Sequence, residues 1–111
     1  MRASKEIVGA STSLLILGLL AKESTYGYAL VRRLNDAAGG IFEWQEGTVY
    51  PLLHKLEKQE LIRARWQETE TGRRRKYYLI TARGRKSLSS EAEQWSAFHA
   101  LILKLAGARH G

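Results

Sequence analysis

The period of the apolar residues changes after Leu61. Before Leu61, apolar residues recur at the three- and four-residue spacing of a helix face. After it, Ile62, Ala64 and Trp66 alternate with polar residues, which is the two-residue period of a half-buried strand. A chain that switches in this way is neither a simple helix bundle nor an all-β domain. It predicts a mainly α fold with a small β-hairpin.

Four helices and one hairpin account for the whole pattern. The helices are expected at about Lys5–Lys22, Tyr26–Ala38, Thr48–Glu60 and Ala82–Ala106. The first strand starts at Ile62, the second covers Tyr77–Thr81, and the polar loop Glu68–Arg73, with Gly72 near its tip, joins them. This is the order of a winged helix-turn-helix, expected over residues 1–81. A long C-terminal dimerisation helix over 82–106 and a frayed tail over 107–111 are expected to follow.

Residues at the expected helix starts fit these bounds. Ser24 or Thr25 can cap the second helix, because a side-chain oxygen accepts a hydrogen bond from a free N–H of the first turn. Thr48 and Thr81 can cap the third and fourth helices in the same way. With Thr48 as the cap, Pro51 falls in the first turn, where its missing N–H costs nothing.

The uninterrupted apolar run Leu14–Ala21, preceded by Arg2 and Lys5, has some likeness to a signal peptide. Eight residues are too few to span a bilayer, and no small-residue cleavage site follows. We therefore expect a helix that is buried on nearly all sides, no membrane contact and a cytoplasmic location. The chain has no Cys, which excludes a disulfide framework and fits a reducing compartment.

The positive charge is concentrated in one part of this 111-residue, single-domain chain. Residues 54–86 contain eleven Lys or Arg and four Glu, which accounts for the entire net charge of +7. Residues 73–86 contain seven basic residues and no acidic one. Most charge runs are simply solvated surface. An excess this localised in a folded domain nevertheless predicts a surface that meets phosphates, and hence a nucleic acid.

Three segments resemble motifs of a known family. Residues 26–28 (YGY) are similar to an HGY element, residues 46–62 (EGTVYPLLHKLEKQELI) to GTLYPLLxRLExxGLI, and residues 74–84 (RRKYYLITARG) to RRKYYxLTxxG. These are motifs of the PadR-type transcriptional regulators, and the chain resembles their compact subfamily from residue 5 to about residue 105. The resemblance implies a homodimeric DNA-binding regulator, usually a repressor, that a small molecule releases.

Two residues depart from the family pattern. Tyr26 replaces His, and we expect this to alter only an edge contact. Glu60 replaces Gly, and we expect this to tighten the end of the third helix without changing the fold.

The third helix is the expected recognition helix. Its free N-terminal N–H groups and dipole attract phosphate, the hydroxyls of Thr48 and Tyr50 can bind phosphate oxygens, and His54 and Lys55 can reach the DNA backbone or base edges. For Tyr50, packing within the protein is as well supported by the sequence as phosphate binding. The basic wing residues suit a minor groove or flanking backbone, although strand alternation must send them to both faces. We expect double-stranded operator DNA to contact Tyr26, Thr48, Tyr50, His54, Lys55, Arg73, Arg74, Arg75 and Lys76.

The last helix carries an apolar seam with no evident partner in the chain. Its members lie at heptad a and d spacing and predict a homodimer interface made by Leu88, Trp95, Phe98, Ile102 and Leu105. The resemblance implies that a planar aromatic effector inserts at this interface beside Trp95. Candidate lining residues are Ile7, Ser13, Leu14, Trp95 and His99. Plain core packing of Trp95 is the alternative.

No catalytic, metal or cofactor site is expected. The chain has one Asp, Asp36, and its three His lack ligand spacing. Two other functions stay open. One is a winged helix used only for protein–protein contact, against which the basic wing argues. The other is an architectural or RNA-binding basic protein, against which the dimer seam and the acidic residues of the third helix argue.

Overall fold

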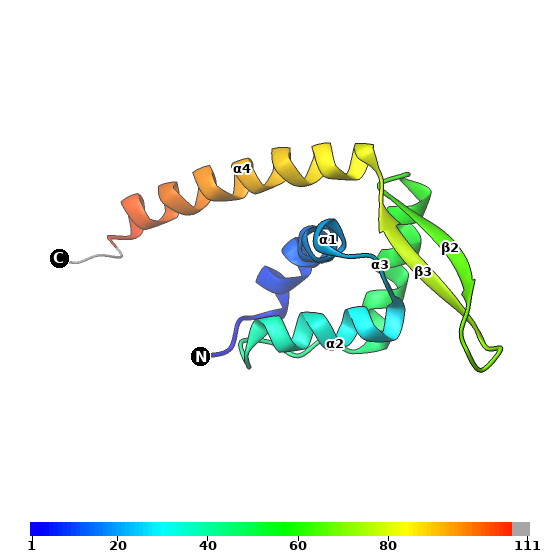
Figure 1. Ribbon diagram of the computed structural model, residues 1–111. Helices are drawn as coiled ribbons and strands as arrows, with labels where there is room; N and C mark the ends of the chain where they lie inside the picture. Colours follow the sequence, from blue (N-terminus) through cyan, green and yellow to red (C-terminus); the bar gives the residue numbers. More distant parts are fainter. Residues whose placement is uncertain (108–111) are drawn as a thin grey trace.

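The computed structural model, which describes residues 1–107, places three short helices around one core, with a small sheet at one end and a long helix across the top (Figure 1). The elements in chain order are α1 (Lys5–Lys22), β1 (Thr25–Tyr26), α2 (Gly27–Ala38), α3 (Glu46–Lys58), β2 (Ile62–Glu68), β3 (Arg74–Ile80) and α4 (Ala82–Ala106). The predicted mainly α, winged helix-turn-helix fold with a long C-terminal helix is confirmed. Apart from Gly107, the tail predicted over 107–111 lies outside the described residues.

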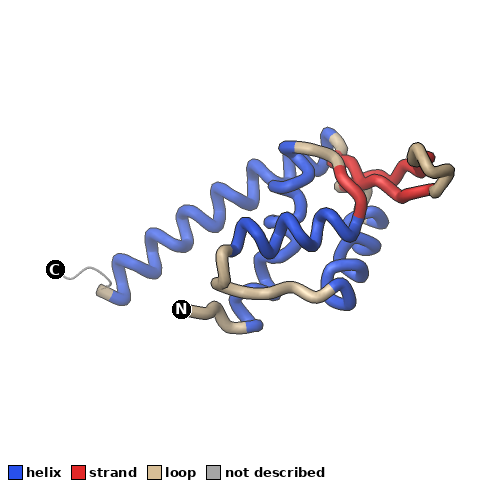
Figure 2. The backbone as a smooth tube through the Cα atoms, turned by 60° about the horizontal axis from the view of Figure 1, so that its bottom comes forward, coloured by secondary structure: helices blue, strands red, loops and turns tan. Residues whose placement is uncertain are grey.

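The sheet has three antiparallel strands in the order β1-β3-β2. β2 and β3 pair without interruption from Ile62 opposite Ile80 to Glu68 opposite Arg74, and together they form the projecting wing (Figure 2). β1 was not predicted, because two residues are too few to show a period. It forms where the chain entering α2 runs beside β3, and Tyr26 then lies opposite Tyr77.

The core fills the space between α1, α2, α3 and the base of the sheet. Its largest fully buried side chains are Ile16, Leu17, Leu30, Val49, Leu53 and Ile62. The loop between α2 and α3 is fixed to this core by Trp44, whose Nε1 donates to Thr12 Oγ1 at 3.0 Å. Asn35 binds both backbone groups of Trp44, accepting from its N–H at 2.7 Å and donating to its carbonyl at 3.2 Å. These bonds hold the start of α3 in place.

α1 is less buried than its composition predicts. Ile16, Leu17 and Leu20 are in the core, but Leu15 is 43% exposed and Ile7 is exposed too. The prediction assumed that the rest of one chain covers every apolar side of this helix. Instead, α4 packs against the core through Leu88, and its C-terminal half extends past the other helices (Figures 1 and 2). One side of α1 is therefore left uncovered.

One of the predicted helix caps is confirmed and two are wrong. Thr81 caps α4 by accepting from Gly84 N–H at 3.0 Å. α2 and α3 instead start after Tyr26 and Gln45, whose side chains make no capping bond. Thr48 cannot be the cap of α3, because its own N–H already donates to the Gln45 carbonyl at 3.0 Å. Pro51 consequently lies inside the helix, beyond the first turn where its missing N–H would cost nothing.

Among residues 1–107, no helix is both long enough and apolar enough to cross a membrane.

Glu60, which follows α3, has a left-handed backbone with φ of 63°. Among the described residues it is the one non-glycine residue with positive φ. The glycine that the family pattern has at this position is thus explained by backbone conformation. The expectation that Glu60 merely tightens the helix end misses the steric cost that a side chain brings in this conformation.

We predict that Glu60→Gly stabilises the protein by about 0.5–1 kcal/mol. Glycine relieves roughly 1–2 kcal/mol of strain in the left-handed backbone. This gain exceeds the roughly 0.4–1 kcal/mol that is lost because glycine makes the unfolded chain more flexible. The Glu60–Arg83 ion pair at 3.9 Å is largely exposed and contributes little. The matched control is Gln59→Gly at φ −80°, which should destabilise. Urea unfolding at one protein concentration compares the three chains. A Glu60→Gly protein less stable than its parent would contradict the strain argument.

Candidate nucleic-acid interface

α3 presents a polar face to solvent, as predicted. Thr48, His54 and Lys55 are exposed, whereas Val49 and Leu53 on the opposite side are fully buried. The helix packs on α2 and on the base of β2, so the core fixes its orientation. The side chains predicted to contact DNA therefore lie on a rigid element and on its free side.

Tyr50 combines the two roles that the sequence left open. Its ring packs on the start of α2 so closely that a Cβ on Gly27 would lie 2.8 Å from the Tyr50 hydroxyl oxygen. The side chain is nevertheless 38% exposed. Burial, then the charge of Glu46 and then Tyr78, raise the pKa of the Tyr50 hydroxyl. The phenol keeps its proton at neutral pH and can donate it to a phosphate oxygen.

The four basic residues of the wing divide between the two faces of the hairpin, as alternation predicts. Directly opposite residues share a face, so Trp66 and Lys76 are on one side, together with Arg74 two residues away. The Arg74 guanidinium lies 5.1 Å from the centre of the Trp66 ring. Arg75 is on the other side, 4.3 Å from the centre of the Tyr26 ring. All four nevertheless line one cleft between the wing and the starts of α2 and α3.

Tyr26 does more than the edge contact expected of it. The Tyr26 and Tyr77 rings pack edge to face with their centres 5.6 Å apart. The Arg75 guanidinium lies over the face of the Tyr26 ring. A guanidinium over an aromatic face is held by cation–π attraction and loses less entropy when it binds an anion. We conclude that Tyr26 orients a wing arginine.

Lys76 differs from the three wing arginines. Its Nζ lies 3.6 Å from the Glu57 carboxylate on α3 and 5.4 Å from the centre of the Tyr78 ring. Lys76 therefore links the wing to α3. It also neutralises Glu57, an acidic residue that would otherwise repel phosphate from α3.

A cleft of about 500 Å³ lies between the wing and the starts of α2 and α3. Its walls combine the wing cations with the aromatic residues Tyr26, Tyr28, Tyr50, Trp66 and Tyr78. Trp66, 56% exposed, and Tyr28 were not among the predicted contacts. The sequence signal for Trp66 was present, since it is a large apolar residue at the far end of a strand, beyond the reach of a small core. Its exposure adds an apolar surface to a basic cleft.

The seam on α4 is mostly uncovered. Leu88 packs against the core, but Phe98 is 58% exposed, Leu105 is 76% exposed, and Trp95 and Ile102 are also open to solvent. The residues proposed for an effector do not share one cavity within a single chain. A shallow hollow of about 380 Å³ is lined by Gln94, Trp95 and Phe98. Leu14 lines a separate groove beside Leu88.

The other three residues proposed to bind an effector are Ile7, Ser13 and His99, and they line neither the hollow at Trp95 nor the groove at Leu14. Ile7 and His99 are exposed and Ser13 is half-buried. A shared site for the five residues stays a prediction about two copies of the chain. Within residues 1–107, no three His, Asp or Glu side chains are grouped to hold a metal ion.

Comparisons with known proteins agree with this geometry. The family model described as "Transcriptional regulator PadR-like family" matches residues 16–90. An uncharacterised protein X of Lysinibacillus sphaericus is 30% identical, over 87% of this chain and 89% of that protein.

Solved structures show the same likeness. A transcriptional regulator from Clostridium thermocellum is 29% identical, with a TM-score of 0.84 over 92% of this chain and 96% of that one. Bacillus subtilis PadR in complex with operator DNA is 27% identical, with a TM-score of 0.66 over 73% of this chain and 45% of that protein. The matching part is thus less than half of Bacillus subtilis PadR.

We predict that Gly27→Ala weakens binding to duplex DNA, because the added methyl group displaces the Tyr50 ring from the edge of the cleft. The matched control is Gly9→Ala, since a Cβ at Gly9 meets nothing within 4 Å. Fluorescence anisotropy with a labelled duplex measures both affinities. Equal affinities for the two variants would show that the position of Tyr50 does not matter for binding.

Proposed function

Since the chain belongs to the PadR-like family of transcriptional regulators, we propose that it is a homodimeric repressor that binds a palindromic operator and is released by a small molecule. The observation that carries the proposal is the cleft between α3 and the wing. There, Tyr50 of α3 lies beside wing cations that are oriented by aromatic rings. This combination fits a sugar–phosphate backbone, whose sugars meet the rings and whose phosphates meet the cations.

In this proposal α3 enters the major groove and the wing follows the neighbouring backbone or minor groove. Thr48 and Tyr50 bind phosphate at the start of α3, while His54 and Lys55 reach towards base edges. Arg73, Arg74 and Arg75 supply the electrostatic part of the affinity. The Bacillus subtilis PadR complex supports this assignment, since a relative of the same fold is bound to operator DNA there.

Two copies are proposed to join through the exposed seam of α4. Phe98, Ile102 and Leu105 are large apolar side chains on a helix that extends away from the body, and burying them against their own copies stabilises a two-fold dimer. A two-fold dimer of winged helices places its two α3 helices for a palindrome whose half-sites are about one helical turn apart.

The effector is proposed to be a planar aromatic molecule held between the two Trp95 side chains. Stacking contributes roughly 0.5–1.5 kcal/mol beyond burial of area, and Ile7, Ser13, Leu14 and His99 would complete the site. Such a ligand releases DNA only if it favours a dimer whose α3 helices are wrongly spaced. Simple packing of Trp95 in the dimer core is the second candidate role.

The wing prediction tests the electrostatic part of the proposal. Changing Arg73, Arg74 and Arg75 together to Ala should leave the fold intact, because all three project from the tip half of the hairpin. Affinity should fall for every DNA sequence, and the slope of log K against log salt should become shallower by about 0.9 for each phosphate that the wing no longer neutralises. The matched control removes the same charge elsewhere, at Arg2, Lys5 and Lys22. Equal slopes for both triple variants would refute a specific role for the wing.

The alternative functions give other results in the same binding assays. A protein–protein module would show no DNA affinity even at low salt. An architectural protein would bind, but a selection from random duplexes would return no shared sequence.

We predict that Phe98→Glu combined with Ile102→Glu converts a dimer at micromolar concentration into a monomer, because burying two unpaired carboxylates at the interface is strongly unfavourable. Light scattering measures the mass. The control is Ala100→Glu, which places one carboxylate on the opposite side of α4 from the seam and should leave the dimer intact. A dimer that survives the double change would place the interface elsewhere.

A further inference from the structure

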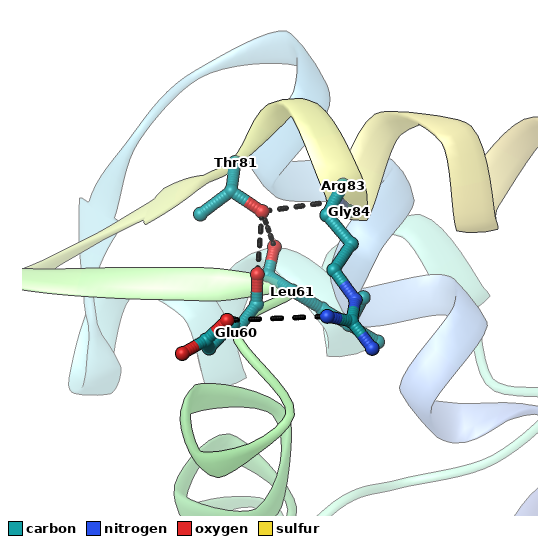
Figure 3. Close-up of polar contacts among 5 residues, drawn as sticks. All are labelled: Glu60, Leu61, Thr81, Arg83 and Gly84. Carbon is teal, nitrogen blue, oxygen red and sulfur yellow. Dashed lines mark hydrogen bonds and ion pairs between the residues drawn. The ribbon is translucent and has the colours of Figure 1, made fainter.

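Thr81 lies where α3, β2, β3 and α4 meet (Figure 3). Its hydroxyl oxygen is 2.7 Å from the Glu60 carbonyl and 3.0 Å from the Leu61 carbonyl, and it donates towards both. The same oxygen accepts from Gly84 N–H at 3.0 Å, and Thr81 N–H donates to the Leu61 carbonyl at 3.0 Å. One residue thus bonds the segment that leaves the recognition helix to the first turn of α4.

The first turn of α4 is also in direct backbone contact with the same segment. Gly84 is buried, and a Cβ there would overlap the Leu61 carbonyl and lie 2.7 Å from Ile80 Cγ1. Arg83 adds an ion pair of 3.9 Å to Glu60 across the junction (Figure 3). The two backbones meet with no intervening side chain to give way, so α4 cannot tilt here without breaking the hydrogen bonds of Thr81.

A second contact fixes α4 to the body one residue further on. Arg85 Nη2 donates to the Ala21 carbonyl, at the end of α1, at 3.3 Å. Beyond this turn and Leu88, the seam of α4 is exposed. The helix is therefore held at its base and free along its far half.

A small change in angle at this junction has a large effect at the far end of α4. The helix has 25 residues, so its length is about 38 Å and a tilt of about 10° moves its far end by roughly 6 Å. The rise along DNA is about 3.4 Å per base pair. A shift of roughly 6 Å therefore corresponds to nearly two base pairs of half-site spacing.

We propose that Thr81 is a positioning residue that sets the angle between α3 and α4, and thereby the half-site spacing that the dimer accepts. This inference rests on the proposed function, because it requires α4 to join two copies and α3 to read DNA. Thr81 itself contacts no DNA. It acts through the two helices that it bonds together.

A simple cap at Thr81 would have a different effect. Loss of a cap lowers the stability of α4 and affects all DNA binding alike. Loss of a positioning bond leaves each α3 able to bind its own half-site, but it weakens the preference for one spacing. The ratio of full-site to half-site affinity separates the two roles.

Three substitutions at Thr81 separate the bonds that it makes. Thr81→Ser keeps both the cap and the donated bond. Thr81→Val keeps the shape and loses both bonds. Thr81→Asp keeps a strong cap for Gly84, but an ionised carboxylate cannot donate to the Glu60 and Leu61 carbonyls. The Asp variant therefore tests the bonds that Thr81 donates to the Glu60 and Leu61 carbonyls, even if loss of the cap prevents the Val variant from folding.

The experiment uses the full chain and a duplex that the unaltered protein selects from a random pool. Binding is measured to that duplex, to versions whose centre is one or two base pairs longer or shorter, and to a single half-site. The Ser variant should keep the spacing preference of the parent. The Val and Asp variants should bind the half-site within about twofold of the parent and lose about tenfold on the full site, with a smaller penalty for altered spacing.

Two other results would contradict the proposal. If the Val variant remains a dimer by light scattering and loses half-site and full-site affinity by the same factor, while the Asp variant, which keeps the cap, binds every duplex as the parent does, Thr81 is only a cap. A selection that returns no inverted repeat would instead overturn the proposed function, and this inference with it. The two failures are distinguishable, because the second is seen with the unaltered protein.

Discussion

The segment that follows α3 and the first turn of α4 meet at a point where only a hydrogen atom fits as a side chain. At Gly84, the first turn of α4 lies against the Leu61 carbonyl, and the Thr81 hydroxyl bonds to the same segment. Two carbonyls of the segment that follows α3, those of Glu60 and Leu61, thereby accept hydrogen bonds from Thr81 at the start of α4. α3, the wing and the exposed seam of α4 all take their relative positions from this contact. The left-handed conformation of Glu60 is the backbone cost of turning the chain there.

The surface on the other side of α3 is organised by aromatic rings more than by ion pairs. Arg74 lies over Trp66 and Arg75 over Tyr26, so each arginine keeps its charge free for a partner. Lys76 is instead paired with Glu57, and its charge is used within the protein. Of the basic residues that give the chain its net charge of +7, Arg74 and Arg75 are thus held ready to bind a partner, whereas Lys76 is not. Neighbouring rings orient these cations and line the same cleft.

The sequence predicts well those features that depend on one residue or on a long period. The Thr81 cap and the bounds of α4 are confirmed, because capping chemistry and helical periodicity act locally. β1 and the start of α3 were missed because they depend on neighbours far away in the sequence. β1 forms only beside β3, and α3 starts early because Trp44 is bonded to Thr12 and Asn35.

In the candidate nucleic-acid interface, too, local features could be predicted and features that depend on distant residues could not. The exposed face of α3 and the two-sided wing could be predicted, whereas the use of Lys76 within the protein depends on where Glu57 lies in three dimensions. Trp66 could have been identified as a large apolar residue beyond the core. The uncovered side of α1 could not be recognised, because composition does not tell whether a helix is covered by its own chain or by another.

In the proposed complex, two α3 helices, held apart by a dimer of α4, read two successive major grooves. Guanine methylation interference on a selected duplex tests it directly, because the methyl group at N7 lies in the major groove. Two clusters of interfering guanines are expected, with their centres about 10 base pairs apart on one side of the DNA helix. A single cluster, or interference spread evenly along the duplex, would contradict it.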